Sequence, residues 1–217
     1  MANIEISQYV VAAITGCWRW ESGVNPKIWE SLIVKTWDYQ YGDDGPHQGG
    51  YGLGQWTNVG TPHGRLWDMH EWFIQQGLTD GDGFGQLEYF LVEDYWTPKT
   101  NTRFHFQTLQ EFLESQSPNL EDLVWDFLAC WEGVTGDHYT ERSRYAREHL
   151  NYIIQHKDDG QTYNWIDGNR YLSLNETLNN VMVVFQNIGK FKPSKKDKKM
   201  PLWMMARRRP FTIELKY

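Results

Sequence analysis

The chain has 217 residues, of which 40% are hydrophobic, and this predicts one sizeable folded domain plus an appendage. No apolar run is long enough to cross a membrane, and two cysteines are too few for a disulfide framework. The net charge is −7 but uneven: residues 1–189 carry 11 Lys/Arg against 26 Asp/Glu, whereas residues 190–217 carry 10 against 2. The acidic body argues against nucleic-acid binding, because phosphate contacts need clustered cations.

The first predicted helix places an acid on its apolar face. Apolar residues recur with helical spacing from Tyr9 to Trp18, and Glu21 continues their stripe just before Gly23 ends the helix. Loss of water and the negative end of the helix dipole both favour the protonated form of a carboxyl placed there. Such a group could protonate a leaving oxygen in glycoside cleavage. The spacing alone also fits an ordinary helix-end glutamate that faces solvent or pairs with Arg19.

The rest of the chain is predicted to be mostly helical, with one small hairpin. Pro26 can start a short helix that runs through residue 32. Residues 33–50 alternate between apolar and polar side chains and then reach a run of Gly, Asp and Pro, which predicts a hairpin or an irregular loop. Apolar periodicity and capping residues predict further helices at about 61–77, 84–95, 105–115, 117–131, 139–155 and 173–188.

Twelve tryptophans are unusual for a chain of this length. Some must fill the core, and since aromatic faces also stack on sugar rings, a carbohydrate groove is a second interpretation. The seven histidines lack metal-ligand spacing, and no Ser-His-Asp or Cys-His nucleophile stands out, so neither a metal nor a cofactor is expected. Cys17 and Cys130 are interpreted as small buried hydrophobes, with a bridge between them left open.

Two motifs, ESGVNP at 21–26 and GGYGLGQW at 49–56, resemble a pair in the goose-type lysozyme and lytic transglycosylase superfamily. There a catalytic Glu is followed by Ser, a small residue and Asn-Pro, and a Gly-x-Gly-Leu-x-Gln segment comes later. The closest resemblance is to phage tail lysozyme domains, over roughly residues 5–155. Looser matches are an Arg on the next helix, an aromatic-Glu pair and an Arg-x-x-x-Ala helix, at Arg65, Trp131-Glu132 and Arg142–Ala146.

The resemblance implies a role for each matching residue. Glu21 would be the general acid, and Ser22 would fix the helix end that carries it. Gly52 would belong to a turn that brings backbone close to the sugar, where a missing Cβ leaves room. Gln55 would hydrogen-bond the substrate or position Glu21. The residues expected to bind the substrate are Ser22, Tyr51, Gly52, Leu53, Gln55, Trp56 and Trp131.

A second carboxylate is the open question of the predicted site. Glycoside cleavage commonly uses one, as a nucleophile or as a base for water. Asp38, Asp43 and Asp44 lie in the predicted hairpin, and Glu132 lies on a helix expected to pack near Glu21. Many members of the superfamily use the substrate's own groups instead, so hydrolysis and transglycosylation both stay open.

The predicted fold is lysozyme-like: mainly α, with one small hairpin lining the substrate cleft, and a C-terminal extension. Residues 1–156 would form the catalytic domain, 157–189 a connecting segment with a C-terminal helix, and 190–217 a basic tail. The expected partners are peptidoglycan glycan strands and, through the basic tail, a virion tail protein.

The expected activity is that of a muramidase, which cleaves the β-1,4 bond between N-acetylmuramic acid and N-acetylglucosamine. In a phage tail it would open the host cell wall during infection. The alternatives are a lytic transglycosylase giving anhydro products, an endolysin, or a non-catalytic sugar-binding or structural tail protein. The first residues lack a secretory signal, which fits delivery by the virion or, for an endolysin, retention in the host cytoplasm until lysis.

Overall fold

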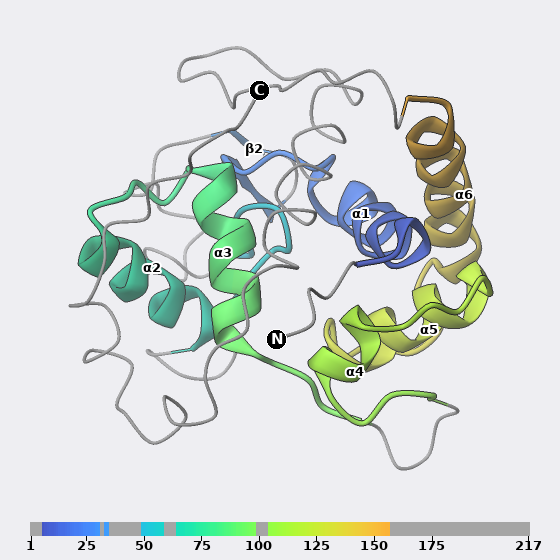
Figure 1. The fold of residues 1–217 in the computed structure, drawn as a ribbon. Coiled ribbons are helices and arrows are strands. Elements are labelled where there is room, and N and C mark those ends of the chain that lie inside the picture. Colours follow the sequence, from blue (N-terminus) through green and yellow to red (C-terminus); the bar gives the residue numbers. More distant parts are fainter. Residues whose placement is uncertain (1–5, 31–32, 35–48, 59–63, 99–103, 157–217) are drawn as a thin grey trace, which may run out of the picture.

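A computed structural model describes residues 6–30, 33–34, 49–58, 64–98 and 104–156. Within these ranges the chain is mainly helical, which confirms the predicted fold class (Figure 1). Its elements are α1 (Gln8–Ser22), β1 (Ile28–Trp29), β2 (Ile33–Val34), α2 (Arg65–Gln76), α3 (Gly83–Glu93), α4 (Leu109–Leu113), α5 (Leu120–Cys130) and α6 (Tyr139–His156).

Helix α1 is the central helix of the domain and packs against both α6 and α5 (Figure 1). The contact with α6 is close because of Gly16 on α1. A Cβ added at Gly16 would lie 2.6 Å from the backbone nitrogen of Ala146 and 2.7 Å from its Cα. Only glycine allows the two helix backbones to approach this far, so residue 16 sets the distance between α1 and α6.

Replacing Gly16 with alanine is therefore expected to lower the free energy of unfolding. The added Cβ meets backbone atoms, which cannot rotate away, and overpacking of this kind costs about 1–3 kcal/mol. Alanine's better helix propensity, worth about 1 kcal/mol, offsets only part of that cost. Urea unfolding would measure the loss, with Asn151→Ala as the control, because Asn151 lies at an exposed position of α6, where an added alanine meets no packed backbone. A Gly16→Ala chain as stable as the wild type would contradict the close approach.

The core beneath α1 is built from aromatic rings around Trp18. The ring centroids of Phe90 and Trp131 lie 5.4 and 5.8 Å from that of Trp18, both with edge contacts. The Trp131 ring also stacks on Phe127, with centroids 5.0 Å apart. Such pairs add about 0.5–1.5 kcal/mol each beyond the area they bury. Among the described residues, four of the chain's twelve tryptophans are at most 1% exposed and fill the core: Trp18, Trp29, Trp56 and Trp131.

Within the described residues the sheet is a two-stranded antiparallel pair, with Ile28 opposite Val34 and Trp29 opposite Ile33. Two isolated bridges, Trp29 with Tyr51 and Tyr51 with Trp56, tie the glycine-rich segment to β1. The predicted short helix from Pro26 is wrong over the described residues, because Ile28–Trp29 pairs as a strand. The remainder of the predicted hairpin, residues 35–48, lies outside the described residues.

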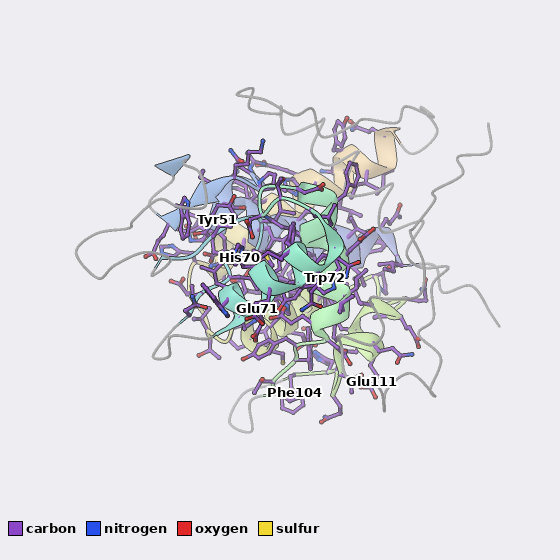
Figure 2. The ribbon with its side chains drawn as sticks, turned by 90° about the vertical axis from the view of Figure 1, so that its left-hand side faces the viewer. Tyr51, His70, Glu71, Trp72, Phe104 and Glu111 are labelled. Atoms are coloured by element: carbon purple, nitrogen blue, oxygen red, sulfur yellow. The ribbon has the colours of Figure 1, made fainter. Side chains whose placement is uncertain are left out.

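The other predicted helices that fall within the described ranges are confirmed, with shifted ends. Helix α4 is shorter than predicted and begins after Thr108, whose side chain accepts a hydrogen bond from the backbone of Glu111. Helix α5 begins after Asn119, which caps it in place of the predicted Ser117-Pro118 start. Figure 2 views the side on which α2 carries His70, Glu71 and Trp72. The predicted start of α2 at Thr61-Pro62 lies outside the described ranges.

The C-terminal third of the chain, residues 157–217, also lies outside the described ranges. This holds for the predicted helix at 173–188 and for the basic tail. Cys17 and Cys130 are buried thiols not joined by a disulfide. In the part of the chain that the structure describes, the helices are too short or too polar to cross a membrane.

Candidate active site

The end of α1 is fixed by a chain of short contacts. Gly23 adopts a left-handed conformation with φ of 59°, and its N–H donates to the carbonyl of Arg19, which ends the helix. The hydroxyl of Ser22 lies 2.9 Å from the carbonyl oxygen of Trp18 and 2.7 Å from that of Leu53. Ser22 thus joins the acid-bearing helix end to the glycine-rich segment, across 31 positions of the chain.

The backbone just after the acid is held in an unusual conformation. Val24 has φ of 56°, a left-handed conformation that a β-branched residue rarely adopts. Its side chain is buried, and the N–H of Asn25 donates to the carbonyl of Ser22 at 3.1 Å. The side chain of Asn25 in turn accepts from the N–H of Lys27 at 2.9 Å. The surrounding packing therefore holds the strained turn that positions Glu21.

A buried glutamine, Gln86 on α3, holds the two motifs together. Its Oε1 accepts from the N–H of Leu53 at 2.8 Å, and its Nε2 donates to the carbonyls of Pro26 and Asp80 at 2.8 and 2.6 Å. Gly52 has φ of 77°, and a Cβ there would lie 2.4 Å from this same Oε1. Gln86 was not predicted from the sequence, although a polar residue inside an apolar helix was a usable signal.

The predicted substrate-binding residues lie in and beneath this turn. Gln55 donates from Nε2 to the carbonyls of Gly52 and Ile28, at 3.0 and 3.3 Å. A Cβ at Gly54 would lie 2.3 Å from the Trp131 ring. The other predicted side chains fill the core instead of lining an open surface, each at most 2% exposed: Ser22, Tyr51, Leu53, Trp56 and Trp131. Their predicted contact with substrate stays a prediction.

Arg142 on α6, the arginine of the matched Arg-x-x-x-Ala helix, binds the carboxyl groups of the site. Its side chain is 0% exposed. It donates from Nη2 to Glu21 and from Nη1 to Oε2 of Glu132, the latter at 2.8 Å. It also donates from Nη1 to the carbonyl of Cys17 and from Nε to that of Asp137, both at 3.2 Å. The buried guanidinium is therefore held by groups from α1 and from the segment between α5 and α6.

Glu21 itself is 27% exposed, which leaves part of its carboxyl open to a ligand. It does not pair with Arg19, the simpler interpretation of the sequence. Arg19 binds Glu148 at 2.7 Å, and its guanidinium lies 4.1 Å from the centroid of the Tyr145 ring. The acid at the helix end is thus partly buried and held by a buried cation.

Of the four predicted partner carboxylates, only Glu132 lies within the described residues. Its side chain is 7% exposed, and it lies two residues after the end of α5. Burial raises the pKa of Glu132 to about 8, with the negative charge of Glu21 adding to the rise and Arg142 opposing it. Asp38, Asp43 and Asp44 lie outside the described ranges.

A further acid, Asp137, was not predicted from the sequence. Its carboxylate is 52% exposed and lies 3.7 Å from the Arg142 nitrogen that also binds Glu21. Its neighbour His138 has φ of 46° and stacks on Trp20, with ring centroids 4.1 Å apart. The segment between α5 and α6 is therefore pinned against the end of α1 beside the candidate acid.

Arg65, matched to the family's arginine on the next helix, is held by an acid that the sequence did not predict. It binds Glu93 through two hydrogen bonds of 2.5 and 3.0 Å. It also donates to the carbonyl of Trp131 at 3.3 Å. Among the described residues, no group of three or more His, Cys, Asp or Glu side chains could hold a metal ion.

These features place the chain in the lysozyme-like class, in which a helix-end glutamate lies beside a glycine turn in a mainly helical domain. The family model described as phage tail lysozyme matches residues 1–153, and the chain belongs to that family. The matched range ends near the end of α6. Among curated proteins, none matches this sequence significantly. Family membership gives the chain a lysozyme-like, peptidoglycan-degrading function.

Proposed function

We propose that the chain is a muramidase that cleaves the β-1,4 bond between N-acetylmuramic acid and N-acetylglucosamine, with Glu21 as the general acid. The observation that carries the proposal is the placement of Glu21. Its side chain is 27% exposed at a fixed helix end and hydrogen-bonded to the buried Arg142. A general acid needs this combination of access to substrate and restricted geometry.

In the proposed reaction, Glu21 gives its proton to the glycosidic oxygen as the bond from that oxygen to the sugar C1 breaks. The bonding electron pair leaves with the oxygen, and the Glu21 carboxylate that remains is stabilised by Arg142. Water then attacks C1 and returns a proton to Glu21, which gives a reducing end. Attack by the muramyl hydroxyl would return the proton in the same way and give an anhydro end.

The proposed setting is a phage tail, where local digestion of the wall would open the host during infection. The family to which the chain belongs supports this setting. The basic segment 190–217, with 10 Lys/Arg against 2 Asp/Glu, is proposed to dock on an acidic surface of a virion tail protein. An endolysin acting from the host cytoplasm is the alternative setting.

Digestion of purified peptidoglycan by the wild-type chain tests the proposed activity. Mass spectrometry is expected to find new reducing N-acetylmuramic acid ends. Anhydro ends would replace the muramidase assignment with that of a lytic transglycosylase. Binding to the wall without any new glycan ends would overturn the enzymatic proposal and favour a sugar-binding or structural tail protein.

A further inference from the structure

The site holds a second carboxyl that the proposed reaction does not use. Glu132 binds Arg142 at 2.8 Å through Oε2, whereas its buried Oε1 has no hydrogen-bond partner among the described residues. A buried ionised oxygen without a donor is costly, and a proton on it removes that cost. One arginine therefore lies between two carboxyls, and its charge can balance only one of them.

We propose that Glu132 is a positioning residue that keeps one proton in the site: Glu21 and Glu132 share a single proton, and Arg142 balances the one remaining negative charge. The inference rests on the proposed function, because it concerns the proton that Glu21 delivers. Without Glu132, the site would lose the second negative charge that opposes the release of the pair's last proton.

The charged and titratable groups that face Glu132 come from several elements. Cys17 and Glu21 lie on α1, Arg142 on α6, and Arg65 on α2. Arg65 is already bound by two hydrogen bonds to a glutamate of α3, Glu93, so its charge is largely balanced. The exposed Asp137 lies 3.7 Å from Nη2 of Arg142, the nitrogen that also binds Glu21.

These groups act on the proton of Glu132 in a definite order. Burial raises its pKa most, Arg142 lowers it next, the charge of Glu21 and a hydrogen bond with Glu21 raise it, and Arg65 lowers it least. The result, a pKa of about 8, agrees with a proton that stays between the two carboxyls at neutral pH. The Cys17 thiol is fully buried and its pKa is raised well above the usual value, so it contributes no charge there.

The number of protons in the site is the same before and after one catalytic cycle. The pair begins with one proton, and Glu21 transfers it to the leaving oxygen as the C1–O bond breaks. The two carboxylates then share Arg142 until water, or the muramyl hydroxyl, attacks C1 and gives its proton back to Glu21. Glu132 takes no part in bond making or breaking, and its role is to raise the proton affinity of the pair.

The test is the pH profile of kcat/KM for Glu132→Gln, measured on soluble peptidoglycan fragments. Glutamine keeps an oxygen for Arg142 but cannot carry the second negative charge. The alkaline limb is expected to move to lower pH by about one unit or more, with activity recovered on acidification. The matched control is Glu121→Gln, which removes an exposed glutamate paired with Arg147 on α6 and should leave the limb in place.

A second readout is the dependence of stability on pH. A carboxyl whose pKa is about 8 when folded, against an ordinary 4.5, binds its proton more tightly in the folded state. Its contribution to stability is therefore fully present below pH 4.5 and is lost as the pH rises towards 8. The wild type should lose more stability over this range than Glu132→Gln does.

An alkaline limb that stays in place while kcat/KM falls at every pH would overturn the proposal, because Glu132 would then be merely structural. If Glu132→Gln does not fold, the pH profile of Glu132→Asp tests the proposal instead, since aspartate keeps a titratable carboxyl. A limb near the wild-type position supports the shared proton, and a limb displaced to lower pH contradicts it. Failure of the proposed function is separate, because it would show as no glycan fragments from the wild-type chain.

Discussion

Replacing Arg142 with methionine is expected to cost the protein both stability and activity. The substitution leaves the buried carboxyl of Glu132 and the half-buried carboxyl of Glu21 without their cation. Removing one partner from a buried ion pair costs about 3–5 kcal/mol. We therefore expect a loss of about this size in urea unfolding at pH 7, and at least about 100-fold less turnover, since Glu21 loses its anchor.

The loss should shrink as the pH is lowered, because carboxyls that become protonated no longer need a counter-charge. Arg142→Lys is expected to recover only part of the stability, because one ammonium cannot reach Glu21, Glu132 and two backbone carbonyls together. The matched control is Arg147→Met on the same helix. Arg147 is 51% exposed and pairs with an exposed glutamate, so its removal should change stability by about 0.5 kcal/mol or less.

Equal losses for Arg142→Met and Arg147→Met would contradict the arrangement. The effect at residue 142 would then come from the helix in general and not from the carboxyls that the guanidinium joins. Retained turnover in a folded Arg142→Met chain would show that Glu21 is held in place without Arg142.

The sequence predicted the parts of the site that depend on local pattern. Apolar periodicity and Gly23 place Glu21 at the end of α1, and the structure has that helix ending there. The two motifs lie close together, joined by Ser22 and Leu53. Local signals suffice in these cases because each element is set by neighbouring residues: an apolar stripe, a left-handed cap and a polar residue at the helix end.

Contacts between residues far apart in the sequence could not be predicted from local pattern. The Arg142–Glu21 pair joins residues 121 positions apart, and the Gln86–Leu53 hydrogen bond spans 33. Neither separation has a periodic signature. Asp137 was missed for the same reason, since a turn aspartate is ordinary until the fold places it beside Arg142.

The wrong helix after Pro26 has a physical cause. The segment carries a good helix start, but Ile28 and Trp29 find strand partners in Val34 and Ile33. Tertiary pairing overrides a local preference of a few tenths of a kcal/mol. The tryptophan count leaves two roles open for a similar reason, because a sequence does not separate a ring that fills the core from one that faces a sugar.

The central claim is that Glu21 delivers the proton that breaks the glycan chain. Its most direct test is the rate at which Glu21→Gln releases fragments from purified peptidoglycan, next to the wild type and Glu121→Gln. Glutamine keeps the shape of the side chain and an oxygen for Arg142, so the fold should survive. We expect a rate about 10²–10⁴-fold lower for Glu21→Gln, with Glu121→Gln unchanged. A folded Glu21→Gln chain that releases fragments at the wild-type rate would contradict the account.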